Sequence, residues 1–317
     1  MAALTTCDVL RQGLDLVGVD TGRIGDTAKE TKFRAHFGSN PQVYRNMYED
    51  LLGHKIIDSP NDLPLTTLLM VIFWLCHYPT EHLQSSRFGM CNETCRKWNW
   101  HVVRLLHELF EIKIRWPARF SNANYHQHII GVDGIHCLTK EKQTDTRPYN
   151  RLDFSHKHGC ASFTYEVGCA VWMQRCVWVN GPFPAGTSDL QMFRMQDGEG
   201  RSISDRCPAR WRRTPATSLK ATIPVGKKAI ADHGLRAETE KVAVSRSTDS
   251  ERVRNLKARV KAREENFNGR LKNFAVLDHK FRHGAGDDGP EKHGLCFRAV
   301  VCIVQYQLEN GSPLFNV

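Results

Sequence analysis

The first third of the chain is dominated by apolar positions that recur at helical spacing. Within residues 33–116 they predict a set of packed helices, and the clearest repeat consists of Val43, Tyr44, Met47, Tyr48, Leu51 and Leu52. The apolar run 63–76 predicts a buried helix that begins at Asn61 or Asp62 as cap, with Pro64 in its first turn. Residues 1–30 have no clear period and are expected to form a loosely ordered lead-in.

Two segments near the end of this region predict a pair of helices joined by a short turn. They are residues 80–88 and 92–110, separated by a break at Gly89, with Asn92 as the cap of the second helix. The arrangement is typical of a helix-turn-helix, in which the start of the second helix meets DNA, so Arg96 and Lys97 are candidate DNA contacts. A plain helical bundle would give the same pattern. Residues 31–117 are therefore expected to form an all-α region, with DNA binding as one interpretation.

After Trp116 and Pro117 the pattern changes to short β-branched and aromatic runs. These predict strands at 129–132, 163–167, 169–172, 177–179 and 229–231, with a turn at 181–184. A helix is predicted from Asp249 to about Asp278. Residues 195–228 are basic and aperiodic, which indicates an insertion or long loop. The order predicts an α/β domain over residues 125–317, preceded by the helical region.

The charge of the chain is concentrated in one segment. The net charge is +10, and between Arg201 and Arg270 there are 18 Lys and Arg but only 8 Asp and Glu, so this segment alone also carries +10. Such an imbalance favours a polyanionic partner, although a solvated surface would have the same composition.

The distribution of apolar residues and cysteines argues against a secreted, membrane-spanning or zinc-stabilised protein. The chain starts without the basic and apolar regions of a signal peptide, and its most apolar run has only about 14 residues, too short for the roughly 20 that a membrane helix needs. The 11 Cys have no disulfide spacing and are expected to be reduced. Cys91 and Cys95 lack a matching second pair, so structural zinc is not expected.

Two acids stand at the ends of predicted strands. Asp133 follows an Ile-Ile-Gly-Val run and Asp232 follows Ala-Ile-Ala, which would hold each carboxylate on a rigid element; either alone could be an ordinary turn residue. On the following helix, Lys261, Glu265, Asn268 and Lys272 share one polar stripe, while Glu264 lies nearer the apolar side. Separated carboxylates suit Mg²⁺, and a pair of such ions can stabilise both oxygens of a displacement at phosphorus.

Several motifs, in order, carry a resemblance to a known family. They are Gly131-Val-Asp133-Gly-Ile-His136, Ser155-His-Lys157, Gly181-Pro-Phe-Pro-Ala-Gly-Thr-Ser-Asp189 continuing to Arg194, Ala231-Asp232-His-Gly234, Arg263-x-Glu265-x-x-Asn268-Gly269-x-Leu271-Lys272-x-Phe274, and Phe281-Arg-His283 followed by Gln305. Over residues 125–315 they closely resemble the DDE superfamily endonuclease domain of PIF/Harbinger-like transposases. Each motif alone is weak, and the specificity lies in their common order.

The resemblance implies an RNase H-like core with Asp on the first strand, Asp on the fourth strand and Glu on a following helix. Asp133, Asp232 and Glu265 are thereby implied as catalytic residues that bind two Mg²⁺ or Mn²⁺ ions, with Glu264 as the competitor of Glu265. Asp189 is a lesser catalytic candidate, because some alignments would take it as the second acid. The chain departs from the family at Leu235, where an aromatic residue is usual, and in its long basic stretch 195–228.

The activity implied is hydrolysis of a phosphodiester at a transposon end, followed by attack of the released 3′-hydroxyl on target DNA. DNA is the implied partner, and the candidate phosphate contacts are Lys157, Lys261, Asn268 and Lys272. The family also implies a nuclear location, a homo-oligomer and a Myb-like partner protein. Two alternatives stay open: a domesticated relative that binds DNA or a partner without cutting, and an RNase H-like nuclease of repair or RNA processing.

Overall fold

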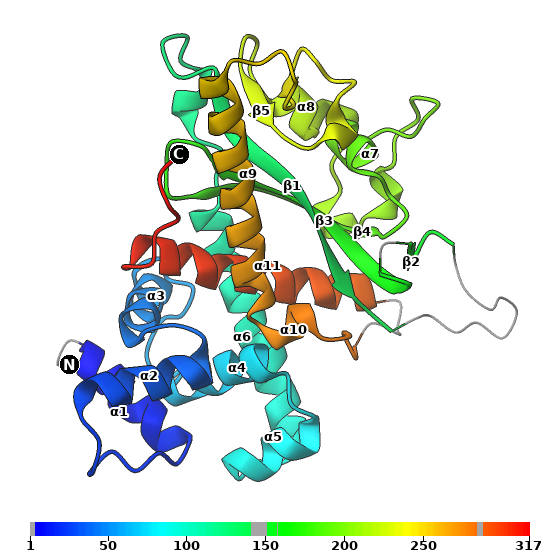
Figure 1. Cartoon of the computed structure of the whole chain (residues 1–317). Helices are drawn as coiled ribbons and strands as arrows, with labels where there is room; N and C mark the ends of the chain where they lie inside the picture. The colour runs from blue at the N-terminus through cyan, green and yellow to red at the C-terminus, as the bar shows by residue number, and fades with distance from the viewer. Residues whose placement is uncertain (1–3, 141–150, 157, 284–287) are drawn as a thin grey trace, which may run out of the picture. The chain divides into compact units, whose positions relative to one another are not determined.

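The computed structural model describes residues 4–140, 151–156, 158–283 and 288–317 (Figure 1). The chain divides into two compact units, neither of which is continuous in sequence. Unit 1 comprises Met1–Lys113, Arg270–His279 and Leu295–Pro313, and unit 2 comprises Ile114–Gly269, Lys280–Gly294 and Leu314–Val317. The division falls within two helices, at Gly269 and at Gly294, so each of these helices has residues in both units.

Unit 1 is helical, as the apolar period predicts. Its N-terminal helices are α1 (Thr6–Leu16), α2 (Asp26–Phe37), α3 (Pro41–Gly53), α4 (Leu65–His77), α5 (Glu81–Phe88) and α6 (Asn92–Lys113). Helix α4 is buried along almost its whole length. Its cap differs from the prediction, because Pro64 is the residue before the helix and Asp62 instead accepts a hydrogen bond from the Ser59 backbone in the preceding turn.

The expected loosely ordered lead-in is wrong. Residues 6–16 form α1, whose start is closed by reciprocal hydrogen bonds between Thr5 and Asp8, and whose Val9 and Leu14 are fully buried. Helix α1 packs closely on α2 because Gly13 has no side chain: a Cβ there would lie 2.4 Å from the Phe33 ring. A few buried residues on a short helix give too weak a period to recognise in the sequence.

Helices α5 and α6 form the predicted pair with a short turn. Gly89 ends α5 in the left-handed conformation (φ 64°), which glycine adopts without strain. Asn92 is already the first residue of α6 rather than its cap. Arg96 of α6 donates two hydrogen bonds to the carboxylate of Glu81 in α5, so an ion pair links the two helices. Lys97 is exposed.

Unit 1 is completed by residues from the far end of the chain. These belong to α10 (Ala275–Asp278) and to the C-terminal part of α11 (Gly289–Glu309). The Tyr306 hydroxyl donates to the Asp50 carboxylate at 2.6 Å, and the Lys113 ammonium lies 2.9 Å from Asp50 and 3.2 Å from Glu309. The division falls at Lys113, where the sequence predicted a boundary near 117–125, and unit 1 also takes in residues 270–279 and 295–313, which the prediction placed in the second domain.

Unit 2 is built on a mixed sheet, so the coarse α/β prediction is confirmed. The strands are β1 (His128–Leu138), β2 (Phe154–Ser155), β3 (Cys160–Ala170), β4 (Cys176–Pro184), β5 (Lys228–Ile230) and β6 (Val242–Ala243). Strand β3 pairs with β1, β2 and β4, always antiparallel, while β5 pairs parallel to β1 and β6 parallel to β5. The main order is thus β4-β3-β1-β5-β6, with β1 in the centre.

Strand boundaries differ from the prediction in three places. Strand β1 continues five residues past Asp133, so this acid lies within the strand and not at its end. The two strands predicted at 163–172 are one strand, β3, and the turn predicted at 181–184 is the end of β4. Strand β6 was not predicted. Paired long strands tolerate Gly and Pro that a sequence pattern interprets as breaks.

Helix α9 (Glu251–Lys272) lies close against the centre of the sheet (Figure 1). Gly131 of β1 permits this approach, because a Cβ there would lie 2.5 Å from Glu264 Oε1 and 2.6 Å from Val260 Cγ1. The helix ends at Lys272, before α10, so the single helix predicted to Asp278 is interrupted.

The stretch 195–228, predicted as an insertion or long loop, is largely irregular. It contains the short helical turns η2 (Ser204–Arg206), η3 (Ala209–Trp211), η4 (Pro215–Thr217) and α8 (Leu219–Thr222). Three further short helices of unit 2 lie outside this stretch: η1 (Ala118–Ser121), α7 (Asp189–Arg194) and η5 (His233–Leu235). The buried side chains of the stretch 195–228 include Ile203, Cys207, Trp211, Leu219 and Ile223. Buried Glu238 pairs with Arg194 and with Lys220, which ties α7 and α8 to the segment after β5. Among all described helices, none is long and apolar enough to cross a membrane.

Candidate active site

Asp133 is held at the centre of the sheet by contacts to both carboxylate oxygens. The Gly134 backbone donates to Oδ1 at 2.8 Å, and the Asn268 side-chain amide on α9 donates to Oδ2 at 2.9 Å. Burial raises the pKa of Asp133, and the negative charges of Asp232 and Asp189 raise it further. Three predicted acids therefore lie close enough to affect one another.

Asp232 comes from the neighbouring parallel strand. Gly131 and Ile230 form the last pair between β1 and β5. Asp133 comes two residues after Gly131, and Asp232 comes two residues after Ile230. Adjacent strands are roughly 5 Å apart, so the register brings the two backbones side by side. The Asp232 side chain is 60% exposed and forms an ion pair with Lys261 of α9. Asp133 is thus half-buried, whereas Asp232 is open to solvent.

Asp189, the lesser candidate, lies against the backbone at both strands. It is the first residue of α7, which Ser188 caps. A Cβ on Gly134 would lie 2.7 Å from its Oδ1, and one on Gly234 would lie 3.4 Å from its Oδ2. These two glycines leave room for the carboxylate between the motifs of Asp133 and Asp232.

The three Asp side chains line one small hollow with a fourth carboxyl group. The lining residues are Val132, Asp133, Gly134, Glu166, Asp189, Met192, Ala231, Asp232 and Leu235, around a volume of about 10 Å³. That is roughly the space of one water molecule. The hollow contains oxygen ligands and no Cys or His.

Glu166 of β3 is the functional candidate that the sequence prediction missed. It is only 3% exposed, its Oε2 accepts a 2.7 Å hydrogen bond from the Trp178 indole, and its Oε1 has no hydrogen-bond partner among the described residues. Burial raises the pKa of Glu166 to about 7, and the charge of Asp189 adds to the effect. The signal in the sequence was that Glu166 is the one charged residue of the predicted strand 163–167.

The two candidate third acids, Glu264 and Glu265, point in different directions from α9. Glu264 is 3% exposed and its Oε1 accepts from the Cys169 backbone at 3.3 Å, whereas Glu265 is exposed. Burial raises the pKa of Glu264 well above its usual range, and the charge of Asp133 contributes. The buried position of Glu264 suits packing of α9 on β1 better than it suits a solvated metal.

Glu265 nevertheless belongs to the stripe of α9 that meets the acids. Lys261, four residues before it, contacts Asp232, and Asn268, three residues after it, contacts Asp133. Residues at these spacings are neighbours on a helix surface. The side chain of Glu265 has no contact to either Asp, so the choice between Glu264 and Glu265 stays a prediction.

The other described candidates for DNA contacts, Lys272, Arg96 and Lys97, do not line the hollow. Lys272, in unit 1, donates to the Leu277 carbonyl at 2.8 Å. Arg96 and Lys97 also belong to unit 1, and Lys157 lies outside the described residues. Among the described residues of this set, Lys261 and Asn268 contact the predicted catalytic acids.

The side-chain oxygens around the hollow suit the chemistry of a hard divalent cation, but they do not form a complete coordination sphere. Carboxylate and amide oxygens are the ligands that Mg²⁺ and Mn²⁺ prefer, and a cation would relieve the repulsion by which Asp232 and Asp189 raise the pKa of Asp133. Within the described part of the chain, no group of three or more His, Cys, Asp and Glu side chains is arranged to hold a metal ion. With Lys261 on Asp232 and Glu265 in solvent, side chains would have to rotate for such a group to form.

In comparisons with known proteins, no family model, curated protein or solved structure matches the chain.

Proposed function

We propose that the chain is a DDE transposase-type endonuclease, which cleaves phosphodiesters at transposon ends with divalent metal ions and transfers the released strand to target DNA. One observation carries the proposal. Asp133 on the central strand and Asp232 after the adjacent parallel strand share a hollow, and the helix that follows in sequence contacts both acids through Asn268 and Lys261.

The strand order supports an RNase H-like core for this site. If the two-residue β2 is set aside, β1, β3 and β4 are the first three strands and are antiparallel, and β5 is the fourth and runs parallel to β1. Asp133 is then on the first strand, Asp232 follows the fourth, and Glu265 is on the next long helix. This is the distribution of acids that the family resemblance implies.

The chain's own groups divide the chemical tasks. Asp133, Asp232 and Glu265 would hold two Mg²⁺ or Mn²⁺ ions, which when bound supply an activated water and neutralise charge on the phosphate. Asn268 orients the Asp133 carboxylate through its 2.9 Å hydrogen bond. Lys261 balances the charge of Asp232 in the free protein and is within reach of a phosphate once that carboxylate binds a cation.

The charge distribution favours DNA as the substrate. Residues 201–270, which carry 18 basic and 8 acidic side chains, include β5 and nearly all of α9, the helix that places Lys261 on Asp232. Cationic surroundings attract the polyanion, while the hollow itself collects the cations. A homo-oligomer, a Myb-like partner and a nuclear location remain part of the proposal through the family resemblance alone.

The second candidate is a domesticated relative that binds DNA without cutting it. It is favoured by the ion pair between Lys261 and Asp232 and by the exposed position of Glu265, which together leave the metal ligands unassembled. A binding protein would keep the basic surface and need no metal.

Nicking of supercoiled DNA by the purified chain, with Mg²⁺ or Mn²⁺, distinguishes the two. We expect cleavage by the wild type and loss of at least about 100-fold in rate for Asp133→Asn, Asp232→Asn and Glu265→Gln, since each removes a charged metal ligand. Glu264→Gln should retain activity, and Glu251→Gln, at the exposed start of α9, is the matched control. DNA binding without cleavage by the wild type, even with transposon ends and a Myb-like partner, would favour the binding protein.

A further inference from the structure

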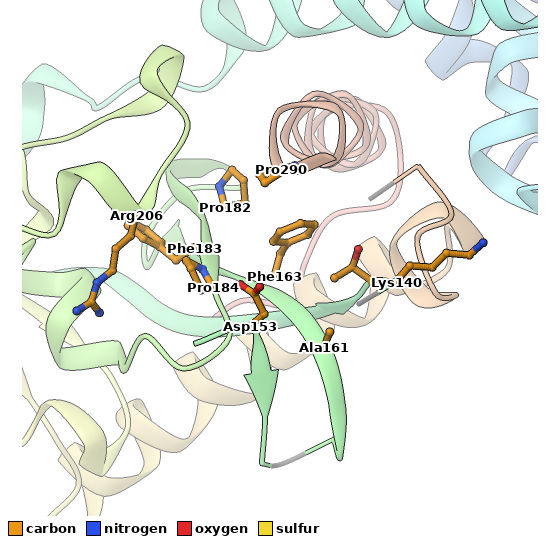
Figure 2. A pocket seen from close by; sticks show the side chains of 10 residues that line it. Lys140, Asp153, Ala161, Phe163, Pro182, Phe183, Pro184, Arg206 and Pro290 are labelled. Carbon is orange, nitrogen blue, oxygen red and sulfur yellow. The ribbon is translucent and has the colours of Figure 1, made fainter. Parts of the chain in front are cut away.

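Open spaces larger than the acidic hollow occur in both units. In unit 2, a cavity of about 190 Å³ lies beside Phe163, Pro182 and Pro290 (Figure 2). In unit 1, a groove of about 460 Å³ runs along the end of α4 and along α5, and it is lined by Phe73, His77, Pro79, Leu83, Ser86 and Arg87. Most of these side chains are exposed, so the groove would not enclose a small ligand. It suits a larger partner that lays side chains into it.

The floor of the groove is apolar and already packed. Phe73 is 7% exposed, and its ring lies against the rings of His77 and Phe88, at centroid distances of 4.3 and 5.4 Å. Leu83, which also lines the groove, is 62% exposed. A partner that covers Leu83 would remove its apolar surface from water, which favours association.

The positive charge of Arg87 is not balanced by an acid. Its guanidinium lies 5.0 Å from the centroid of the Phe73 ring and donates one hydrogen bond, to a backbone carbonyl at 3.1 Å; no carboxylate among the described residues pairs with it. Glu81, the acid at the start of α5, is held instead by Arg96. Burial lowers the pKa of His77, and the charge of Arg87 lowers it further, so the groove has a positive field.

An acidic amphipathic helix combines the two features that the groove requires. Leu83 and Arg87 are four residues apart and therefore neighbours on α5. An apolar residue and an acid at the same spacing on a partner helix would cover the first and reach the second. Arginine can bind a carboxylate through two parallel hydrogen bonds, and Arg87 has donors left for them. Nucleic acid would offer phosphates to Arg87 but no apolar side chain to Leu83.

We propose that this groove docks an amphipathic helix of a partner protein, with an apolar side chain over Phe73 and Leu83 and a carboxylate on Arg87. The proposal does not rest on the nuclease function, because the groove belongs to unit 1 and no predicted catalytic acid lines it. Arg96 and Lys97, the predicted DNA contacts of α6, do not line it either. DNA and the partner would therefore use different residues.

Fluorescence anisotropy with the full chain tests the proposal. The probe is a fluorescein-labelled helical peptide of about 15 residues with Leu on one face and Glu on the other, and its matched peptide has Lys in place of Glu. We expect the Glu peptide to bind at least about ten-fold more tightly than the Lys peptide. Leu83→Ser should weaken the Glu peptide about ten-fold, because it removes most of one covered apolar side chain. Val225→Ser, at an exposed apolar residue outside the groove, is the matched control.

Arg87→Gln gives an independent measurement. It should weaken the Glu peptide about ten-fold and leave the affinity of the Lys peptide unchanged or higher, a difference that a general loss of structure would not produce. Arg252→Gln, exposed near the start of α9, is its matched control and should bind both peptides as the wild type does.

Each outcome decides the proposal. Absence of binding, equal affinity for the two peptides, or an affinity that Leu83→Ser leaves unchanged would overturn it. If duplex DNA displaces the Glu peptide and itself loses affinity in both groove variants, the groove binds nucleic acid and the proposal fails. Leu83→Ser should nick supercoiled DNA at the rate of the wild type, so the docking site and the nuclease can fail separately.

Discussion

Replacing Glu166 by Gln should change how the stability of the protein depends on pH. Burial among the sheet residues, with one oxygen on the Trp178 indole and the other unpartnered, raises the pKa of Glu166 to about 7 from an ordinary value of 4.5. The folded protein thus prefers the protonated group. Its stabilising effect is fully present below pH 4.5 and is lost as the pH rises through 7.

The size of the effect follows from the two pKa values. The full difference corresponds to about 3.4 kcal/mol, of which about 2.5 kcal/mol is lost between pH 5 and pH 8. Glu166→Gln keeps an acceptor for the indole of Trp178 but does not titrate. We therefore expect its free energy of unfolding to be flatter than that of the wild type by about 2.5 kcal/mol over this interval.

Urea denaturation at pH 5, 6, 7 and 8 in metal-free buffer, followed by circular dichroism, measures the difference. Glu251→Gln, exposed at the start of α9, controls for the removal of one carboxylate and should match the wild type at every pH. If Glu166→Gln and the wild type lose the same stability between pH 5 and pH 8, Glu166 is ionised in the folded protein and the argument from its burial is wrong.

Three further predictions concern helix packing, metal affinity and unit 1. Gly131→Ala should cost about 1–3 kcal/mol of stability in urea, because its methyl would lie 2.5 Å from Glu264; unchanged stability would mean that α9 can move away. Lys261→Met should tighten Mn²⁺ binding in calorimetry by leaving Asp232 unpaired, and weaker binding would contradict the charge-balancing role. Tyr306→Phe should cost about 1.5–3 kcal/mol by removing a hydrogen bond to a carboxylate of α3, a loss that equal urea midpoints would exclude.

The sequence was informative where local pattern and packing agree. The helical period of residues 33–116, the strand that carries Asp133 and the strand before Asp232 were all predicted, because apolar runs of those lengths have few alternatives. Parallel pairing of β1 with β5 then brought the two acids to one hollow. Asp189 joined them through contacts with two glycines, which no spacing rule predicts.

Other parts of the fold depend on contacts that the local pattern does not contain. The stretch 195–228 is ordered by Trp211 and by the ion pairs of Glu238 rather than by a period of its own. Glu166 looked like one polar position in a strand, and only the pairing of β3 with β1 and β4 puts it beside the acids. Glu264 and Glu265 are adjacent in sequence, so the choice between them depends on a helix rotation that the period did not resolve.

The discontinuity of the two units has a consequence for how the protein is made. Unit 1 needs residues 295–313 as well as the first 113, so its helices cannot complete their packing until the ribosome has synthesised Pro313. Until then Asp50 lacks the Tyr306 hydroxyl, and the buried faces of α3, α4 and α6 await the C-terminal segments. A fragment ending at residue 117 would therefore be an incomplete body with exposed apolar surface, prone to aggregate and to engage chaperones during synthesis.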